Sequence, residues 1–184
     1  MAAIIFRQKK WRYWFKILDV NSDLLLTVDD WNKVADEFIE GHQLQGSAAV
    51  KARSAMLDWG TLVFGLGLDG VEEVTEELFV RTLAKFYQQN PKYAEEVVGE
   101  IYQKLIDISD QDKDGYITEQ EFVIMNKAFG FDEASSKKLY QYIGPPEDAR
   151  GIEKETMVDF WVEFVTGQDQ NIFHRIVCLV DGLD

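Results

Sequence analysis

Residues 110–121 contain the densest set of possible metal ligands in the chain. Asp110, Asp112 and Asp114 place carboxylates at alternate positions, and Glu121 follows at the end of the segment. These oxygen donors suit a hard divalent cation such as Ca²⁺, which binds about six to eight oxygen atoms. Gly115 permits a sharp turn, and the backbone carbonyl of Tyr116 supplies one further oxygen. We therefore predict a calcium site in this segment.

The order of these residues is that of the EF-hand calcium loop, D-x-[DN]-x-[DN]-G-x₅-E, at each diagnostic position. Thr118 stands at position 9, where a side chain can hold a bridging water, and Glu121 at position 12 can chelate through both oxygens. The alternative is an acidic surface turn, but such a turn does not require five residue types in one fixed register.

A second segment, residues 19–30, repeats the pattern in part. Asp19, Asn21 and Asp23 stand at positions 1, 3 and 5, with the carbonyl of Leu25 at position 7. Position 12 is Asp30, whose shorter side chain reaches an ion more easily with one oxygen than with two. This favours six-coordinate Mg²⁺ relative to Ca²⁺. We predict a weaker or magnesium-tolerant site; the alternative is a loop that only retains acidic residues.

Leu24 occupies the position where the pattern has the turn glycine. A side chain in the left-handed conformation costs about 1–2 kcal/mol. We therefore expect Leu24→Gly to tighten cation binding by the loop 19–30, which is the first loop in chain order.

Two further segments, 67–78 and 145–156, align with these loops but lack ligands at positions 1, 5 and 12, so we predict that neither binds metal. Arg150 would add a cation at position 6 of the second of them. The remaining acidic residues in both segments are better interpreted as solvated loop charges. The three ligand positions hold Gly67, Val71 and Leu78 in the one segment and Pro145, Ala149 and Thr156 in the other. The solvated charges are Glu72, Glu73, Glu147 and Asp148.

The four loops are flanked by apolar residues at helical spacing, which predicts an all-α fold of four helix–loop–helix units. The apolar residue at position 8 of each loop should form a short antiparallel strand with its partner loop. Thr118 and Thr27 should also cap the helices that leave their loops. We expect two paired lobes, residues 1–90 and 91–184, packed into one compact globule, each with one active and one degenerate loop.

Composition excludes several classes of function. The net charge of −14 argues against binding to nucleic acid or to an anionic membrane surface. A single cysteine, Cys178, suits a reducing compartment. The first residues contain no apolar run of the length that a signal peptide needs, and no stretch approaches the length of a membrane span, so we expect neither feature. On these grounds we expect a cytoplasmic protein, and we expect it to be a monomer. No nucleophilic triad or phosphate loop is visible in the sequence, so we also expect that the protein is not an enzyme.

Over nearly its whole length the chain resembles invertebrate sarcoplasmic calcium-binding proteins and the related calexcitins. The features that carry this resemblance are the Trp- and Phe-rich first helix, the Asp-x-Asn-x-Asp…Thr-x-x-Asp-Trp first loop, and Phe-Trp-Val-Glu-Phe at 160–164. The resemblance implies Ca²⁺/Mg²⁺ sites and a C-terminal tail, here 172–180, that packs over the apolar cleft. Relatives generally keep three working loops, whereas the two intact loops of this chain predict two bound Ca²⁺ ions, with Mg²⁺ competing especially at 19–30. A partner-binding helix is the alternative for this tail.

The resemblance leaves three functions open. The first is a Ca²⁺/Mg²⁺ buffer, which the scarcity of methionine supports, because sensors that wrap their targets use Met-rich grooves. The second is a calexcitin-like sensor that exposes an apolar surface to a protein target. The third is a luciferin-type carrier of a small molecule, for which the aromatic residues could line a cavity.

Overall fold

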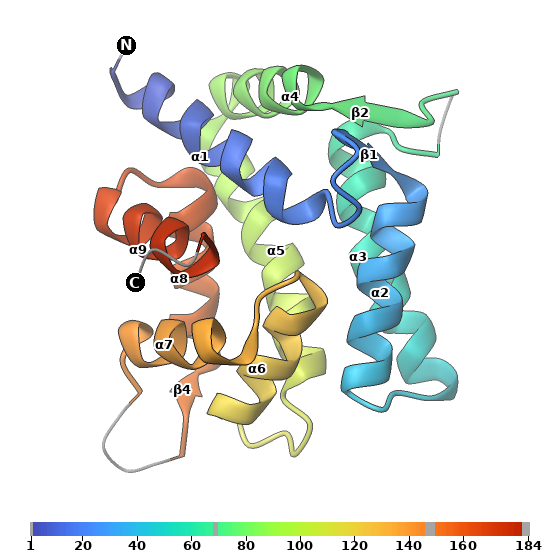
Figure 1. Ribbon diagram of the computed structural model, residues 1–184, viewed down its shortest axis with the longest axis vertical. Helices are drawn as coiled ribbons and strands as arrows, with labels where there is room; N and C mark the ends of the chain where they lie inside the picture. The colour runs from blue at the N-terminus through green and yellow to red at the C-terminus, as the bar shows by residue number, and fades with distance from the viewer. Residues whose placement is uncertain (1, 68–69, 146–149, 182–184) are drawn as a thin grey trace.

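The computed structural model describes residues 2–67, 70–145 and 150–181, and these residues are predominantly helical (Figure 1). The predicted all-α fold with two short strand pairs is confirmed. The helices are α1 (Ala2–Leu18), α2 (Val28–Gly41), α3 (Gly46–Phe64), α4 (Glu76–Gln89), α5 (Pro91–Ser109), α6 (Glu119–Ala128), α7 (Glu133–Ile143), α8 (Lys154–Thr166) and α9 (Gln170–Val180). The strands are β1 (Leu25–Thr27), β2 (Glu73–Thr75), β3 (Tyr116–Ile117) and β4 (Ile152–Glu153).

The strands pair as the loop alignment predicted. β1 runs antiparallel to β2 with Leu26 opposite Val74, and β3 runs antiparallel to β4 with Ile117 opposite Ile152. All four of these position-8 side chains are buried. The labels β2 and β4 lie at opposite ends of the molecule in Figure 1, so the two loop pairs are far apart.

Capping residues set where the exit helices begin. Thr27 accepts a hydrogen bond from the backbone N–H of Asp30, and Thr118 accepts one from that of Glu121. In both cases the acidic side chain bonds back to the threonine N–H, which completes a capping box. The predicted capping roles of both threonines are confirmed. The same residues therefore start a helix and belong to a candidate metal loop.

The two halves of the chain form one compact body. Helix α2 packs against α6, α3 against α5, and α1 against α8, so contacts between the halves run along the molecule. One cluster of buried apolar side chains includes Trp14 and Phe38 from the first half and Phe122 and Trp161 from the second. The predicted single globule is confirmed. None of the helices described is long and apolar enough to cross a membrane.

Helix α1 donates hydrogen bonds to the C-terminal end of α8. The guanidinium Nε of Arg7 lies 2.5 Å from the carbonyl oxygen of Thr166, and the indole Nε1 of Trp11 lies 2.9 Å from that of Val165. The buried Lys10 ammonium donates to the carbonyls of Glu163 and Gly167 at 3.0 and 2.7 Å. The last carbonyls of a helix have no partner within it. Polar side chains at one end of the chain therefore satisfy backbone groups near the other end.

Helix α9 covers part of the same region. Its residues Phe173, Ile176 and Leu179 are buried, and the Phe173 ring meets those of Phe6 and Tyr13 edge-on at centroid distances of 5.7 and 5.8 Å. It also packs against α7. The apolar face of this tail is thus occupied within the molecule.

Candidate metal centre

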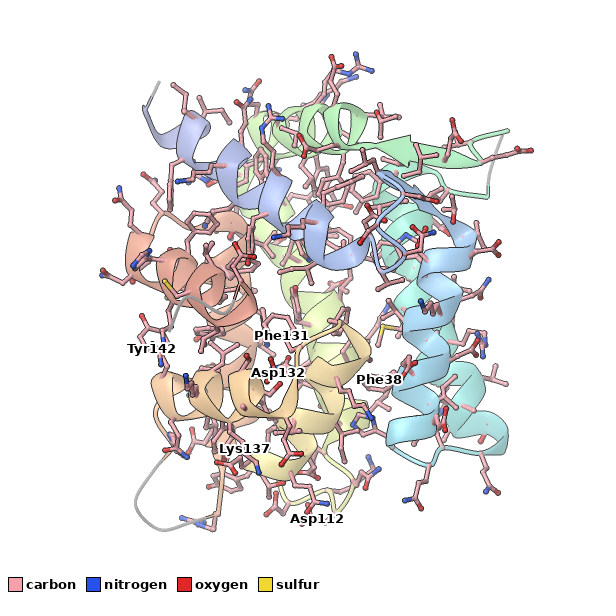
Figure 2. The ribbon with its side chains drawn as sticks, viewed as in Figure 1. Phe38, Asp112, Phe131, Asp132, Lys137 and Tyr142 are labelled. Atoms are coloured by element: carbon pink, nitrogen blue, oxygen red, sulfur yellow. The ribbon has the colours of Figure 1, made fainter. Side chains whose placement is uncertain are left out.

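Carboxylate oxygens converge in the loop between α5 and α6. One oxygen from each of Asp110, Asp112 and Asp114 lies within 4.8 Å of the others. Asp110 is buried, whereas Asp112 and Asp114 are exposed, and Asp112 lies at the edge of the molecule in Figure 2. Three oxygens at this spacing can be ligands of one cation.

Local backbone conformation brings these carboxylates together. Lys113 and Gly115 have φ angles of 61° and 89°, in the left-handed region, which bends the chain around the loop centre. The N–H of Gly115 donates to Oδ2 of Asp110 at 3.3 Å, and the N–H of Tyr116 donates to Oδ1 of Asp114 at 2.8 Å.

Oδ1 of Asp110 is buried and accepts no hydrogen bond from the described residues. A buried carboxylate oxygen without a donor is costly, and a cation would satisfy it. The donor set therefore fits Ca²⁺.

Glu121 closes the loop from its other end. Its Oε1 accepts the N–H of Gln111 at 2.9 Å, and its Oε2 accepts the N–H and hydroxyl of Thr118 at 2.9 and 2.8 Å. Both oxygens are thereby held in place, one on each side of the loop. This arrangement positions the side chain that would chelate the ion with two oxygens.

A lysine from the fourth helix–loop–helix unit, the fourth hand, whose loop is 145–156, contacts the loop 110–121, which is the third loop in chain order. Nζ of Lys154 lies 2.9 Å from Oδ2 of Asp110 and 3.0 Å from Oδ1 of Asp107. Burial acts to raise the pKa of Asp110, but hydrogen bonds from Lys154 and from backbone N–H groups outweigh it and leave the pKa lowered. The hydrogen bond to Asp110 in turn raises the pKa of Lys154. The pair is therefore ionised at neutral pH.

Sequence reasoning missed Lys154, although the strand register contained the signal. Once Ile117 pairs with Ile152 and Tyr116 with Glu153, the next position brings residue 154 opposite Gly115. The N–H of Lys154 indeed donates to the carbonyl of Gly115 at 3.2 Å. Gly151, the residue before β4, allows the two loops to approach, because a Cβ there would lie 2.6 Å from the carbonyl oxygen of Ile117.

The loop at 19–30 has the same backbone frame. Ser22 and Leu24 have φ angles of 59° and 71°, matching the left-handed positions of the third loop. The N–H of Leu24 donates to Oδ2 of Asp19 at 2.9 Å, and that of Leu25 to Oδ1 of Asp23 at 2.9 Å. The amide of Asn21 donates to Oδ2 of Asp23 at 3.0 Å. Asp19, Asn21 and Asp23 are thus tied together around one loop centre.

The two loops differ in how position 12 closes them. Oδ2 of Asp30 accepts both the N–H and the hydroxyl of Thr27, at 2.9 and 2.8 Å. Val20, the counterpart of Gln111, donates its N–H to Leu18 at 2.9 Å instead of to the position-12 carboxylate. Asp30 is therefore not held by the position-2 N–H at the start of its loop, as Glu121 is by the N–H of Gln111.

The segments 67–78 and 145–156 offer fewer oxygens among their described residues. The N–H of Gly67 donates to the carbonyl of Val71 at 2.9 Å, which joins positions 1 and 5 directly. Glu72 and Glu73 are exposed. In the other segment, Arg150 lies over the ring of Tyr116, 4.9 Å from its centroid, so it contacts the third loop. Glu147, Asp148 and Ala149 of this segment lie outside the described residues.

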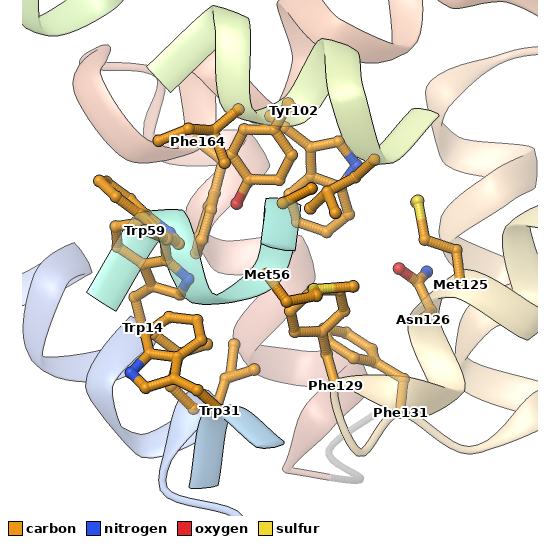
Figure 3. Close-up of a pocket in the computed structure, with 16 residues that line it drawn as sticks. Trp14, Trp31, Met56, Trp59, Tyr102, Met125, Asn126, Phe129, Phe131 and Phe164 are labelled. Atoms are coloured by element: carbon orange, nitrogen blue, oxygen red, sulfur yellow. The ribbon is translucent and has the colours of Figure 1, made fainter. Parts of the chain in front are cut away.

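An aromatic cavity lies between the halves of the molecule, lined by side chains from α1, α2, α3, α5, α6 and α8 (Figure 3). Three of its buried N–H donors, on Trp31, Asn126 and Trp161, have no hydrogen-bond partner among the described residues. The enclosed space is only about 30 Å³. Small-molecule sites usually measure about 300–1,000 Å³, so in this conformation the cavity holds at most a few waters.

Comparisons with known proteins agree with this geometry. No family model matches the chain. It is 28% identical over 161 residues to a sarcoplasmic calcium-binding protein of Mizuhopecten yessoensis, covering 87% of this chain and 89% of that protein. The predicted resemblance to such proteins is confirmed.

Solved structures show the same fold. The calcium-loaded apo form of the coelenterazine-binding protein of Renilla muelleri superposes with a TM-score of 0.71 at 16% identity, covering 94% of each chain. The photoprotein mitrocomin of Mitrocoma cellularia gives a TM-score of 0.73 at 14% identity, covering 97% of this chain and 91% of that one. At these identities the likeness concerns the fold alone.

Proposed function

We propose that the protein binds Ca²⁺ in the loop 110–121 and Ca²⁺ or Mg²⁺ in the loop 19–30, with Asp110, Asp112, Asp114, Tyr116 and Glu121 as the principal ligands of the stronger site. The observation that carries this is the buried Oδ1 of Asp110, which accepts no hydrogen bond from the described residues, beside two further carboxylates and a fixed Glu121. The name of the Mizuhopecten relative supports the same conclusion.

Glu121→Gln tests this site. The amide keeps the shape of the side chain but loses its charge and one acceptor, so calcium affinity at one site should fall by at least about a hundredfold. Isothermal titration calorimetry of calcium gives the number of sites and their affinities. Glu119→Gln is the matched control, because it removes the same charge from the same helical turn while its side chain bonds to Gln141 instead. Unchanged stoichiometry and affinity in the Glu121 variant would contradict the assignment.

We propose that this binding serves as a cytoplasmic Ca²⁺/Mg²⁺ buffer in which each half of the chain pairs one binding loop with one silent loop. The support is that the two ends of the chain are packed together. Side chains of α1 donate hydrogen bonds to carbonyls at the end of α8, and α9 covers apolar surface. A sensor would have to break such contacts to expose a groove. The small central cavity also gives no space for a carried molecule, so we do not favour a luciferin-type carrier.

A calcium titration at about 1 mM Mg²⁺, followed with the apolar dye ANS, separates buffer from sensor. For a monomeric buffer, dye fluorescence should stay flat or fall as calcium binds. A steep rise at one equivalent would instead show an apolar surface opening toward a protein target.

A further inference from the structure

The fourth hand, although silent as a binding loop, directs two cationic side chains at the third. Lys154 pairs with Asp110 and Asp107, and Arg150 stacks on the ring of Tyr116. The two residues flank β4, Arg150 shortly before it and Lys154 directly after it at the start of α8. The backbone N–H of Lys154 donates a hydrogen bond to the carbonyl of Gly115. The lysine is therefore held in register with the loop.

The contact lies in a part of the molecule that water screens poorly. The side chain of Asp110 is only 2% exposed and that of Lys154 27% exposed. Electrostatic interactions of such groups are stronger than those on an open surface. Lys154 contacts Oδ2 of Asp110, whereas Oδ1 of the same carboxylate remains without a donor from the described residues. The ammonium thus leaves Oδ1 available to a cation, and lies on the other oxygen of the same carboxylate.

We propose that Lys154 is a fixed internal counter-ion of the loop 110–121. It lowers the calcium affinity of that loop below what its carboxylates alone would give, and it keeps the crowded carboxylates together when calcium is scarce. This inference rests on the proposed function. It assigns the fourth hand a role in setting the affinity of the third.

The first test replaces the charge and leaves the backbone contacts. Lys154→Met and Lys154→Gln should each tighten calcium binding at 110–121 by about tenfold, because a unit charge close to a divalent ion is removed. Lys154→Arg should keep an affinity close to that of the unchanged protein. The Gly115 amide resonance in ¹H–¹⁵N NMR reports this loop specifically, since that N–H is bonded to Asp110.

Lys92→Gln is the control for net charge. Lys92 is 86% exposed and lies near the start of α5, about 27 Å along the helix from Asp110, so its loss should leave the affinity unchanged. Equal or weaker binding in both neutral Lys154 variants, or equal tightening in the Lys92 variant, would overturn the proposal.

The second test uses protein in excess chelator. Without the internal counter-ion the carboxylates repel one another, so both neutral variants should unfold at a lower temperature than the unchanged protein, and the arginine variant should not. An unchanged unfolding temperature would overturn this part of the inference. If instead the Gly115 resonance of the unchanged protein fails to respond to calcium at all, the proposed function itself is wrong, which distinguishes the two failures.

Discussion

Replacement of Leu24 by glycine tests whether the first loop stores backbone strain. Leu24 has a φ angle of 71°, and its side chain is 74% exposed. The substitution therefore removes little buried surface. It also preserves the N–H that donates to Asp19 at 2.9 Å. What changes is the Cβ, which makes the left-handed conformation unfavourable.

The expected magnitude follows from two opposing contributions. Relief of the left-handed conformation is worth about 1–2 kcal/mol. The greater freedom of glycine in the unfolded chain costs roughly 0.5–1 kcal/mol. The net gain in the free energy of unfolding is about 0–1.5 kcal/mol, with a central value of about 0.75 kcal/mol. For a chain of this size the central value raises the midpoint of thermal unfolding by about 1.5–3 °C.

The assay is thermal unfolding under saturating calcium, with Leu24→Ala as the matched control. Alanine removes the exposed side chain but retains the Cβ, so it should give no stabilisation. Calcium titration of the glycine variant should also show tighter binding by the first loop, because glycine adopts the bound backbone without strain. Equal midpoints for the glycine and alanine variants, or a lower midpoint for glycine, would refute the strain argument.

Three further predictions concern other regions. Asp30→Glu should raise the preference of the first loop for Ca²⁺ over Mg²⁺, because the longer side chain can offer two oxygens to the ion. Calorimetry of Ca²⁺ binding in competition with Mg²⁺ measures this preference, and an unchanged preference would contradict the argument. Truncation after Gly167 removes α9 and should increase ANS binding, whereas unchanged binding would mean that α9 covers no apolar surface. Burial lowers the pKa of Lys10 to about 8, so between about pH 8 and 10 the unfolded chain binds more protons than the folded one and stability should rise with pH. Lys10→Met should abolish that slope in denaturant unfolding; a slope that persists in the variant would assign it to another group.

The sequence was sufficient to predict the repeated helix–loop–helix unit and the pairing of its strands, because each loop has an apolar residue at position 8 and the local pattern fixes that position. Leu26 and Ile117 pair with Val74 and Ile152 as that alignment requires. The ligand positions of the third loop follow from the same spacing, and the structure brings Asp110, Asp112 and Asp114 within reach of one cation.

The sequence pattern does not predict side-chain contacts between residues far apart in the chain. The pairing of Lys154 with Asp110 depends on how two hands face each other, and the bonds from Lys10 to Gly167 depend on the crossing of α1 and α8. The strand register places the backbone of Lys154 opposite Gly115, but neither side-chain contact has a periodic signal, because long-range side-chain contacts depend on how whole elements pack. Arg150 is a further example: its place in the sequence predicts a cation at position 6 of its own loop, whereas its guanidinium lies over the ring of Tyr116 in the third loop.

The bonds between α1 and the end of α8 also have a consequence for how the protein is made. Lys10 and its acceptor Gly167 are separated by 157 residues. At a synthesis rate of about 5–20 residues per second, Lys10 waits roughly 8–30 s on the ribosome before that carbonyl exists. During this interval α1 cannot form its hydrogen bonds to α8. The contacts that join the two helices therefore form only after residue 167 has been synthesised.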